Sequence, residues 1–273
     1  MLQRLYANGI TMGVRVQGEG RPIVFIHGHG FESSSWQPQL DYFGRGYRAI
    51  AYDVRGHGMT DVATKGYTMR ELAVDLAALL DVLEVEQAVV CGLSMGGMIA
   101  MQAVVDFPTR VAAVILADTA LPEFITPADQ LLLRLRAIYE HGLERLADDV
   151  GERYFGKRFR ETKPDFRHWW RARYTENNLA GLTGCLLAMW DRPDITDRLR
   201  VLGLPALVIV GDEDQVTPPD AARRIAETIG GASLAVLPET GHIANEERPV
   251  EFNRLVQDFL DRVGWESVHR TPA

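Results

Sequence analysis

The pentapeptide Gly92-Leu93-Ser94-Met95-Gly96 lies between two runs of different character, and this setting constrains the fold more than any other feature of the chain. The run before it, 87–91, is short and apolar, as expected of a buried strand. The run after it, 97–105, is rich in Ala and Met and predicts a helix. A strand that turns directly into a helix exposes the side chain at the turn, and flanking glycines allow the tight bend. We therefore predict that Ser94 is a nucleophile at the start of a helix.

Apolar runs of strand length alternate with helical runs along much of the chain. This alternation predicts an α/β fold with a mostly parallel central sheet flanked by helices. Several of the strand-like runs are apolar throughout, as expected when both faces of a sheet are covered. Helical spacing of apolar residues is clear over 71–83 and 249–263. The predicted strands are 22–26, 47–52, 88–91, 111–116, 206–210 and 233–237.

The alternation breaks between residues 122 and 202, where the pattern is helical and no central strand is evident. We expect this insertion, 122–202, to form a helical cap over the carboxyl edge of the sheet, where open α/β sheets bind ligands. Residues 1–121 and 203–273 would then form the core domain. Large apolar side chains of the insertion either pack the cap onto the core or line a substrate pocket. The candidate pocket residues are Trp169, Trp170, Met189 and Trp190.

Charge and composition exclude several classes of partner. The net charge of −8 and the pI near 5.4 argue against nucleic acid. No apolar run reaches the roughly 18–20 residues that span a bilayer, and the N-terminal segment lacks the apolar stretch of a secretory signal. We therefore expect no membrane partner and a cytoplasmic location. Cys91 and Cys185 have no metal-ligand spacing and are expected to be buried thiols. A homo-oligomer is compatible with the sequence, which does not define the oligomeric state.

A serine hydroxyl needs a base to become a strong nucleophile, and the base needs a carboxylate that fixes its tautomer. His242 follows the last predicted strand, where a loop could bring it over the sheet edge, so it is the predicted base. Asp214 follows the strand 206–210 and is the predicted acid. Asp118, at the end of the strand 111–116, is its rival for this role. The order serine, aspartate, histidine along the chain is that of α/β-hydrolases.

An acyl-transfer site also needs hydrogen-bond donors for the oxyanion that forms on the substrate. We assign these donors to the backbone N–H groups of Met95 and His29, the latter in a glycine-containing loop after an early strand. The side chains of His27 and His29 suggest a metal site, but no third ligand lies at suitable spacing, so we predict no metal. No G-x-G-x-x-G motif opens a helix after the first strand, and we expect no cofactor. The polar segment 53–58 is interpreted as a structural turn whose charged pair fixes the loop beside the site.

Together these motifs resemble those of the α/β-hydrolase superfamily over essentially the whole chain. They occur in the order His27-Gly28, 53–58, 92–97, 211–214 and Gly241-His242. The resemblance implies the roles given above to Ser94, Asp214, His242, His29 and Met95. Within the superfamily, 92–102 followed by 116–120 is most similar to the 3-oxoadipate enol-lactonase group. The resemblance therefore implies a serine hydrolase that cleaves a small carboxylic ester or lactone through an acyl-enzyme on Ser94.

Other functions remain compatible with the same motifs. They are a C–C bond hydrolase of a vinylogous diketone, a perhydrolase or haloperoxidase-like enzyme, and a small-molecule receptor of hydrolase fold. The region 131–173 holds 11 Lys and Arg against seven Asp and Glu, in contrast to the negative charge of the whole chain. One hypothesis is that a basic cap attracts substrates that carry a carboxylate. The alternative is that these charges lie on solvated helix faces.

Overall fold

The protein is described by a computed structural model that places residues 2–124 and 127–267. Its strands are β1 (Leu2–Ala7), β2 (Ile10–Gln17), β3 (Pro22–Ile26), β4 (Arg48–Tyr52), β5 (Ala88–Leu93), β6 (Val111–Ala117), β7 (Ala206–Gly211) and β8 (Ser233–Leu237). Within the described residues they form an eight-stranded sheet in the order β1-β2-β4-β3-β5-β6-β7-β8. The pairs β1–β2 and β2–β4 are antiparallel, and the other pairs are parallel. The sheet is therefore mostly parallel, as predicted.

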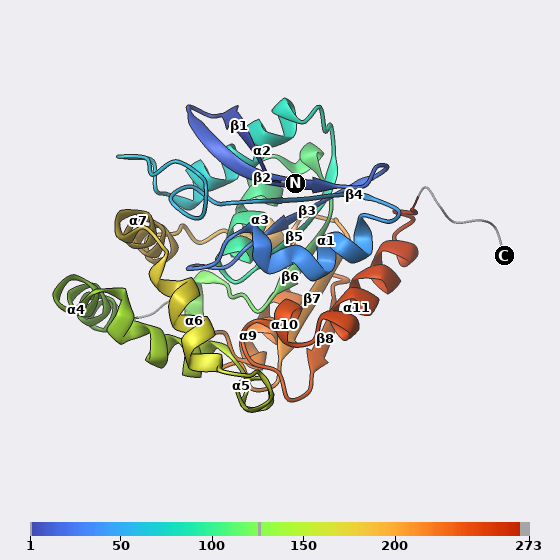
Figure 1. Ribbon diagram of the computed structural model, residues 1–273. Coiled ribbons are helices and arrows are strands. Elements are labelled where there is room, and N and C mark those ends of the chain that lie inside the picture. The colour runs from blue at the N-terminus through green and yellow to red at the C-terminus, as the bar shows by residue number, and fades with distance from the viewer. Residues whose placement is uncertain (1, 125–126, 268–273) are drawn as a thin grey trace.

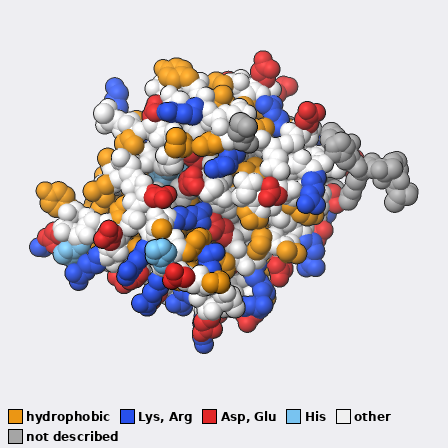
Figure 2. Space-filling model, in the orientation of Figure 1, with side chains coloured by type: hydrophobic (Ala, Val, Ile, Leu, Met, Phe, Trp, Pro, Cys, Tyr) orange, Lys and Arg blue, Asp and Glu red, His pale blue; other side chains and the backbone are white. Residues whose placement is uncertain are grey.

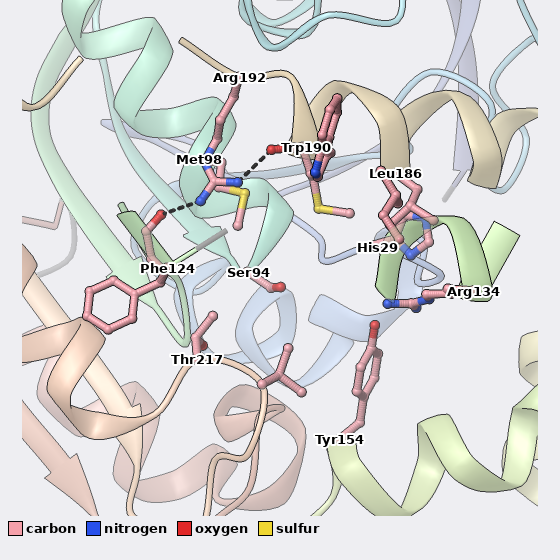
Figure 3. Close-up of a pocket in the computed structure, with 14 residues that line it drawn as sticks. His29, Ser94, Met98, Phe124, Arg134, Tyr154, Leu186, Trp190, Arg192 and Thr217 are labelled. Carbon is pink, nitrogen blue, oxygen red and sulfur yellow. Dashed lines mark hydrogen bonds between the residues drawn. The ribbon is translucent and has the colours of Figure 1, made fainter. Parts of the chain in front are cut away.

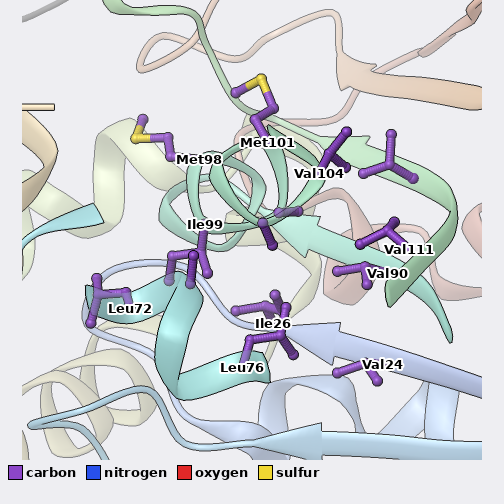
Figure 4. Packing of buried hydrophobic residues seen from close by; sticks show 14 of the residues in the cluster. Val24, Ile26, Leu72, Leu76, Val90, Met98, Ile99, Met101, Val104 and Val111 are labelled. Carbon is purple, nitrogen blue, oxygen red and sulfur yellow. The ribbon is translucent and has the colours of Figure 1, made fainter. Parts of the chain in front are cut away.

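Helices cover both faces of the sheet (Figure 1). One face packs against α1 (Gln37–Phe43) and α11 (Pro249–Arg262), and the other against α2 (Met69–Val82), α3 (Met95–Asp106) and α9 (Pro219–Thr228). Figure 4 shows the second layer, with side chains of α2 and α3 packed beside those of the strands. The short elements are α10 (Ala244–Glu247) and the 3-10 turns η1 (Ser33–Trp36), η2 (Pro108–Arg110) and η3 (Pro122–Phe124).

The strand β3 shows why the parallel strands are apolar throughout. Ile23 and Phe25 pack into the layer with α1 and α11, whereas Val24 and Ile26 pack into the layer with α2 and α3. All four side chains are fully buried. Successive side chains of a strand point to opposite faces, so a sheet covered on both faces leaves no position for a polar residue.

The hairpin of β1 and β2 is the main element that apolar periodicity does not predict. Residues of β1 are mostly exposed or half-buried, so the strand lacks an apolar run. The turn between the strands is Asn8-Gly9, with φ of 46° and 76°. Asn-Gly is a strong hairpin signal because both residues tolerate positive φ. This dipeptide was the sequence feature from which the hairpin could have been predicted.

The chain between β6 and β7 is helical, and none of its described residues forms a strand. The helices α4 (Ala128–Tyr154), α5 (Lys157–Thr162), α6 (Phe166–Thr175) and α7 (Leu179–Trp190) lie at the left and lower left of Figure 1, whereas α8 (Thr196–Arg200) packs against α3 and α9. The long helix α4 is interrupted at Gly142, which has φ of 70° and ψ of −172°. The division into a core of 1–121 and 203–273 and a cap of 122–202 stays a prediction. For the described residues, we find no helix with the length and apolar character needed to cross a membrane.

Candidate active site

Ser94 lies at the sharp turn between β5 and α3, with φ of 53° and ψ of −114°. Positive φ is strained for a residue with a side chain, and such strain concentrates at functional turns. The turn can close because Gly92 and Gly96 lack a Cβ. A Cβ on Gly92 would collide with the carbonyl of Gly96, and a Cβ on Gly96 would collide with the carbonyl of Ile26. The backbone therefore presents the Ser94 hydroxyl at the carboxyl edge of the sheet.

Ser94, His242 and Asp214 form a continuous chain of hydrogen bonds. The Nε2 atom of His242 lies 2.8 Å from Oγ of Ser94, and its Nδ1 atom lies 2.8 Å from Oδ2 of Asp214. The other carboxylate oxygen, Oδ1, accepts the N–H groups of Val216 at 2.7 Å and Thr217 at 3.0 Å. The Thr217 hydroxyl donates to Oδ2 of Asp214 at 2.8 Å. A carboxylate at Nδ1 selects the tautomer in which Nε2 can accept the serine proton.

Asp118, the rival acid, is bonded elsewhere. Its Oδ1 accepts the N–H of Gly211 at 3.0 Å, and its Oδ2 accepts the N–H of Ala244 at 3.1 Å. Burial and the adjacent charge of Asp214 raise the pKa of this carboxyl well above its usual range. Asp118 therefore links the loop that carries Asp214 to the loop that carries His242, whereas Asp214 holds the contact with the imidazole.

The two predicted oxyanion donors lie beside Ser94. Met95 is the first residue of α3, so its N–H has no acceptor within the helix. Gly28 packs against the serine, because a Cβ on Gly28 would lie 3.4 Å from Cβ of Ser94. The backbone of the next residue, His29, is thereby held next to the nucleophile. Both residues are at the site, and their role as donors stays a prediction.

Three histidines near the site are buried and neutral. The ring centroid of His57 lies 5.2 Å from that of His27 and 5.8 Å from that of His29. Burial lowers the pKa of His27 to about 4 and the pKa of His29 and His57 to about 3. His27 Nε2 accepts the N–H of Val54 at 2.8 Å, and His57 Nε2 accepts the N–H of Gly30 at 3.3 Å. These rings join two loops, and the described residues contain no group of three or more potential metal ligands.

The charged residues of 53–58 do not pair with each other as the sequence suggested. Asp53 accepts the N–H groups of Ser33 at 2.7 Å and Met59 at 2.8 Å. Arg55 instead forms a bidentate pair with Asp75 of α2, at 2.8 and 2.7 Å. The segment is structural, because each charge anchors it to a different neighbour.

A cavity opens onto Ser94 beneath the helices α4 and α7 (Figure 3). Much of its wall is apolar, and its main apolar residues are Met98, Phe124, Leu131, Leu186, Met189 and Trp190. A polar region lies at the side where His29, Arg134 and Tyr154 meet. Apolar walls with a few convergent polar groups are typical of small-molecule sites.

The cavity contains two of the four predicted pocket residues. Met189 and Trp190 line it, but Trp169 and Trp170 do not. Trp170 is fully buried between the cap and the core, and its Nε1–H donates to the carbonyl of Ala147 at 2.6 Å. Trp169 packs at the cap surface, with Nζ of Lys163 at 4.0 Å from its ring. The assignment of these two tryptophans to the pocket was wrong because their side of α6 faces other aromatic side chains.

Two arginines, Arg134 and Arg192, line the cavity without a carboxylate partner among the described residues. Arg192 donates to the carbonyl oxygens of Met189 at 2.6 Å and Leu121 at 3.0 Å. Burial lowers the pKa of this guanidinium to about 10. Because its contacts tie the end of α7 to the loop after β6, Arg192 has a structural role in the cavity wall.

Arg134 is different, because its guanidinium faces into the cavity. It interacts with the hydroxyl groups of Tyr154 and Tyr174, and the hydroxyl of Tyr154 points at it in Figure 3. Its Nη2 atom and the Nδ1 atom of His29 are buried and have no hydrogen-bond partner among the described residues. Sequence reasoning missed Arg134, because the same apolar run contains Arg136 and only packing separates the two.

Comparisons with known proteins identify the family of this chain. A family model described as the alpha/beta hydrolase fold matches residues 21–249. The chain belongs to this family. It is 33% identical over 260 residues to 3-oxoadipate enol-lactonase 2 of Acinetobacter baylyi, covering 95% of each chain. It is 33% identical over 236 residues to a non-heme chloroperoxidase of Streptomyces lividans, covering 79% of this chain and 83% of the relative.

A solved structure is also similar to this chain. The enol-lactonase from Burkholderia xenovorans superposes with a TM-score of 0.88 at 29% identity, covering 95% of this chain and 100% of that chain. The α/β-hydrolase fold predicted from the motifs is therefore confirmed, as is the likeness to the enol-lactonase group. The relatives are enzymes of the same superfamily with different reactions, so the reaction of this α/β-hydrolase has to be argued from its own site.

Proposed function

We propose that this α/β-hydrolase is a serine hydrolase that cleaves a small carboxylic ester or lactone through an acyl-enzyme on Ser94. The observation that carries the proposal is the chain of hydrogen bonds from Ser94 through His242 to Asp214, with both links 2.8 Å long. Ser94, at one end of this chain, lines a cavity suited to a small organic substrate. The enol-lactonase relatives support the same reaction class.

The mechanism follows from these contacts. Ser94 Oγ attacks the substrate carbonyl carbon while His242 Nε2 takes the hydroxyl proton, and the carbonyl electron pair moves onto oxygen. The N–H groups of His29 and Met95 donate to this oxyanion, which lowers the barrier. The oxyanion then collapses, the bond to the leaving oxygen breaks, and His242 protonates that oxygen. Water attacks the acyl-enzyme by the same route, so that the acid is released and Ser94 is restored.

The substrate class follows from Arg134. The guanidinium of Arg134 is buried, its Nη2 has no hydrogen-bond partner among the described residues, and no carboxylate balances its charge. Burying such a charge lowers folding stability unless a ligand supplies the missing acceptor. A substrate carboxylate would supply the missing charge, with the hydroxyl of Tyr154 as a second donor. The proposed substrate is therefore an ester or lactone that carries a carboxylate away from the scissile bond.

The outer face of the cap attracts an anionic substrate less strongly than the excess of Lys and Arg in its sequence suggests. Many of its arginines are paired, for example Arg167 with Glu152 at 3.2 Å and Arg136 with Glu140 at 2.7 Å. Figure 2 shows Lys and Arg side chains interspersed with Asp and Glu on the visible face. Exposed pairs are screened by solvent. Recognition of an anion is therefore assigned to the interior Arg134 rather than to the cap surface.

The reaction class is tested with p-nitrophenyl acetate and butyrate, wild type against Ser94→Ala. Wild type should turn over both esters and take up one serine-directed phosphonate per chain, as seen by intact mass. The variant should lose turnover by at least about 10⁴-fold and take up no phosphonate. Retained turnover in the variant would contradict an acyl-enzyme on Ser94. No turnover and no adduct with wild type would favour a receptor or a narrow C–C bond hydrolase.

The substrate class is tested with a matched pair of esters, p-nitrophenyl butyrate and p-nitrophenyl hydrogen glutarate. Arg134→Met should raise KM for the anionic ester by roughly 10–100-fold, as expected for a lost hydrogen bond between charged groups, and leave the neutral ester within about twofold. The control is Arg136→Met, which removes an exposed arginine that pairs with Glu140 at 2.7 Å. If both esters respond alike to Arg134→Met, the carboxylate role is wrong.

A second reaction is favoured by the chloroperoxidase relative. Hydrogen peroxide in place of water would attack the acyl-enzyme and release a peracid, with no other change in the site. Wild type given acetate and peroxide should then oxidise bromide, as monochlorodimedone bromination reports. Absence of bromination under conditions in which the esters are turned over would restrict the enzyme to hydrolysis.

A further inference from the structure

The loop that carries His242 is bound to the cap through one carboxylate, that of Glu247 in α10. Its two oxygens accept the N–H of Gly241 at 3.1 Å each, and Oε1 accepts the N–H of Ile243 at 3.3 Å. Oε2 also accepts the N–H of Gly156, in the cap, at 2.9 Å. Glu247 therefore holds both neighbours of His242 and the segment that follows α4 at the same time.

The backbone of the cap meets this loop directly as well. The N–H of His242 donates to the carbonyl of Tyr154, the last residue of α4, at 2.6 Å. The approach is close enough to require glycine on both sides. A Cβ on Gly156 would lie 2.8 Å from the nitrogen of Gly241 and 2.9 Å from Oε2 of Glu247, and a Cβ on Gly241 would collide with the nitrogen of Gly156. The base and the cavity residue Tyr154 thus belong to one connected unit.

The charge of Glu247 has no Lys or Arg partner among the described residues. Burial raises the pKa of this carboxyl to about 7, although its three backbone donors and the nearby His242 favour the ionised form. Asp118 also faces it electrostatically, and Glu213 accepts the N–H of Lys157 at 2.8 Å across the same junction. The Glu247 carboxylate therefore lies near other acids and is held by backbone N–H groups. Its protonation would weaken these hydrogen bonds between the loop of His242 and the cap.

We propose that Glu247 is a positioning residue for His242, whose ionised carboxylate fastens the loop of the base to the cap. The inference rests on the proposed serine hydrolase and adds a residue that does not touch the substrate. When the carboxylate is neutralised, one of its two oxygens no longer accepts freely from the three backbone N–H groups. The loop of His242 is then held less firmly, so turnover falls, while substrate binding at Arg134 is retained.

The first test compares kcat of wild type and Glu247→Gln with p-nitrophenyl butyrate from pH 8 to pH 6. Gln has the same size but presents an NH₂ group to backbone donors. At pH 8 the variant should be about tenfold slower with KM within about twofold. At pH 6, where about a tenth of the wild-type carboxylate is ionised, the ratio of the two kcat values should fall to about two. Glu251→Gln is the control, since it removes a half-exposed carboxylate of α11 that pairs with Arg248 at 3.6 Å.

The second test acts on the cap and leaves Glu247 intact. Gly156 has φ of −61° and ψ of 157°, which alanine adopts without strain, so Gly156→Ala acts through its new Cβ. That Cβ would press on the nitrogen of Gly241, on Oε2 of Glu247 and, at 3.0 Å, on Oε2 of Glu213. It should lower kcat as Glu247→Gln does. Gly203→Ala is the control, because a Cβ there meets nothing within 4 Å.

The outcomes separate this proposal from the proposed function. Turnover by wild type together with a phosphonate adduct on Ser94 would support the proposed serine hydrolase function, whatever the results for the Glu247 variant. Wild-type kcat in both Glu247→Gln and Gly156→Ala would overturn the positioning role, and a tenfold kcat ratio that stays constant from pH 8 to pH 6 would overturn its dependence on protonation. If Glu247→Gln does not fold, Gly156→Ala and its control decide the question alone.

Discussion

The Nε2 atom of His242 lies 2.8 Å from the hydroxyl oxygen of Ser94, although 148 positions separate the two residues. His242 follows β8 and Ser94 follows β5, and the strands β6 and β7 lie between them in the sheet. The contact therefore depends on loops that cross the sheet edge, held by Asp118, Asp214 and Glu247. Changes in these carboxylates should affect turnover more than folding.

The first prediction concerns Asp214. Asp214→Asn should lower kcat about 10⁴-fold, because an amide at Nδ1 selects the wrong histidine tautomer. The amide oxygen can still accept the N–H groups of Val216 and Thr217, so the melting temperature should change little. Steady-state kinetics with p-nitrophenyl butyrate measure kcat, and a thermal melt measures the melting temperature. A loss of less than tenfold would transfer the role of the acid to Asp118.

The second prediction separates the two kinds of cap tryptophan. Trp170→Ala should cost roughly 3–5 kcal/mol of unfolding free energy, because it empties a fully buried site between cap and core. Trp190→Ala should instead enlarge the cavity and shift the preference among p-nitrophenyl esters towards longer acyl chains. Urea denaturation and a series from acetate to octanoate measure the two effects. Equal acyl preference in wild type and Trp190→Ala would remove Trp190 from the substrate pocket.

The third prediction concerns the pair formed by Arg55 and Asp75, whose side chains are 5% and 2% exposed. Asp75→Asn removes the carboxylate that holds Arg55 through two hydrogen bonds and leaves Glu71, at 3.4 Å, as its carboxylate partner. The free energy of unfolding in urea should fall by about 3 kcal/mol, as for a broken buried pair. Asp197→Asn is the comparison, because Asp197 pairs with Arg200 while 92% exposed. Exposed pairs contribute about 0–1 kcal/mol. Similar losses for the two variants would show that the Arg55 pair is not effectively buried.

The fourth prediction concerns pH and His57, whose pKa burial lowers to about 3 from 6.5. Between these two values the unfolded chain binds a proton at this residue and the folded chain does not. Folding stability from a neutral His57 is therefore fully present above pH 6.5 and is lost as the pH falls below it. Relative to His57→Gln, wild type should lose about 1.4 kcal/mol per pH unit below pH 6. Urea denaturation at pH 7, 6 and 5 gives this difference, and a constant value would contradict a neutral buried ring.

Much of the fold could be predicted because its signals are local. The strands β3 to β8 are short apolar runs, and α2 and α11 show helical spacing, so their bounds agree with prediction within a few residues. The hairpin of β1 and β2 could not be predicted from apolar runs, because β1 is largely exposed. In the cap, apolar and aromatic residues occur on several helices, and their spacing does not say which helix face meets the cavity.

The sequence by itself determined the strand–turn–helix around Ser94 and the loops that carry Asp214 and His242, because glycine positions and strand ends are properties of short segments. Only the tertiary structure decided that Asp214 rather than Asp118 contacts the imidazole, that Trp190 rather than Trp170 faces the cavity, and that Arg134 rather than Arg136 points inward. These choices depend on how residues far apart in the chain pack against one another. The two members of each pair are the same type of residue in similar local sequence patterns, and only their burial and their partners distinguish them.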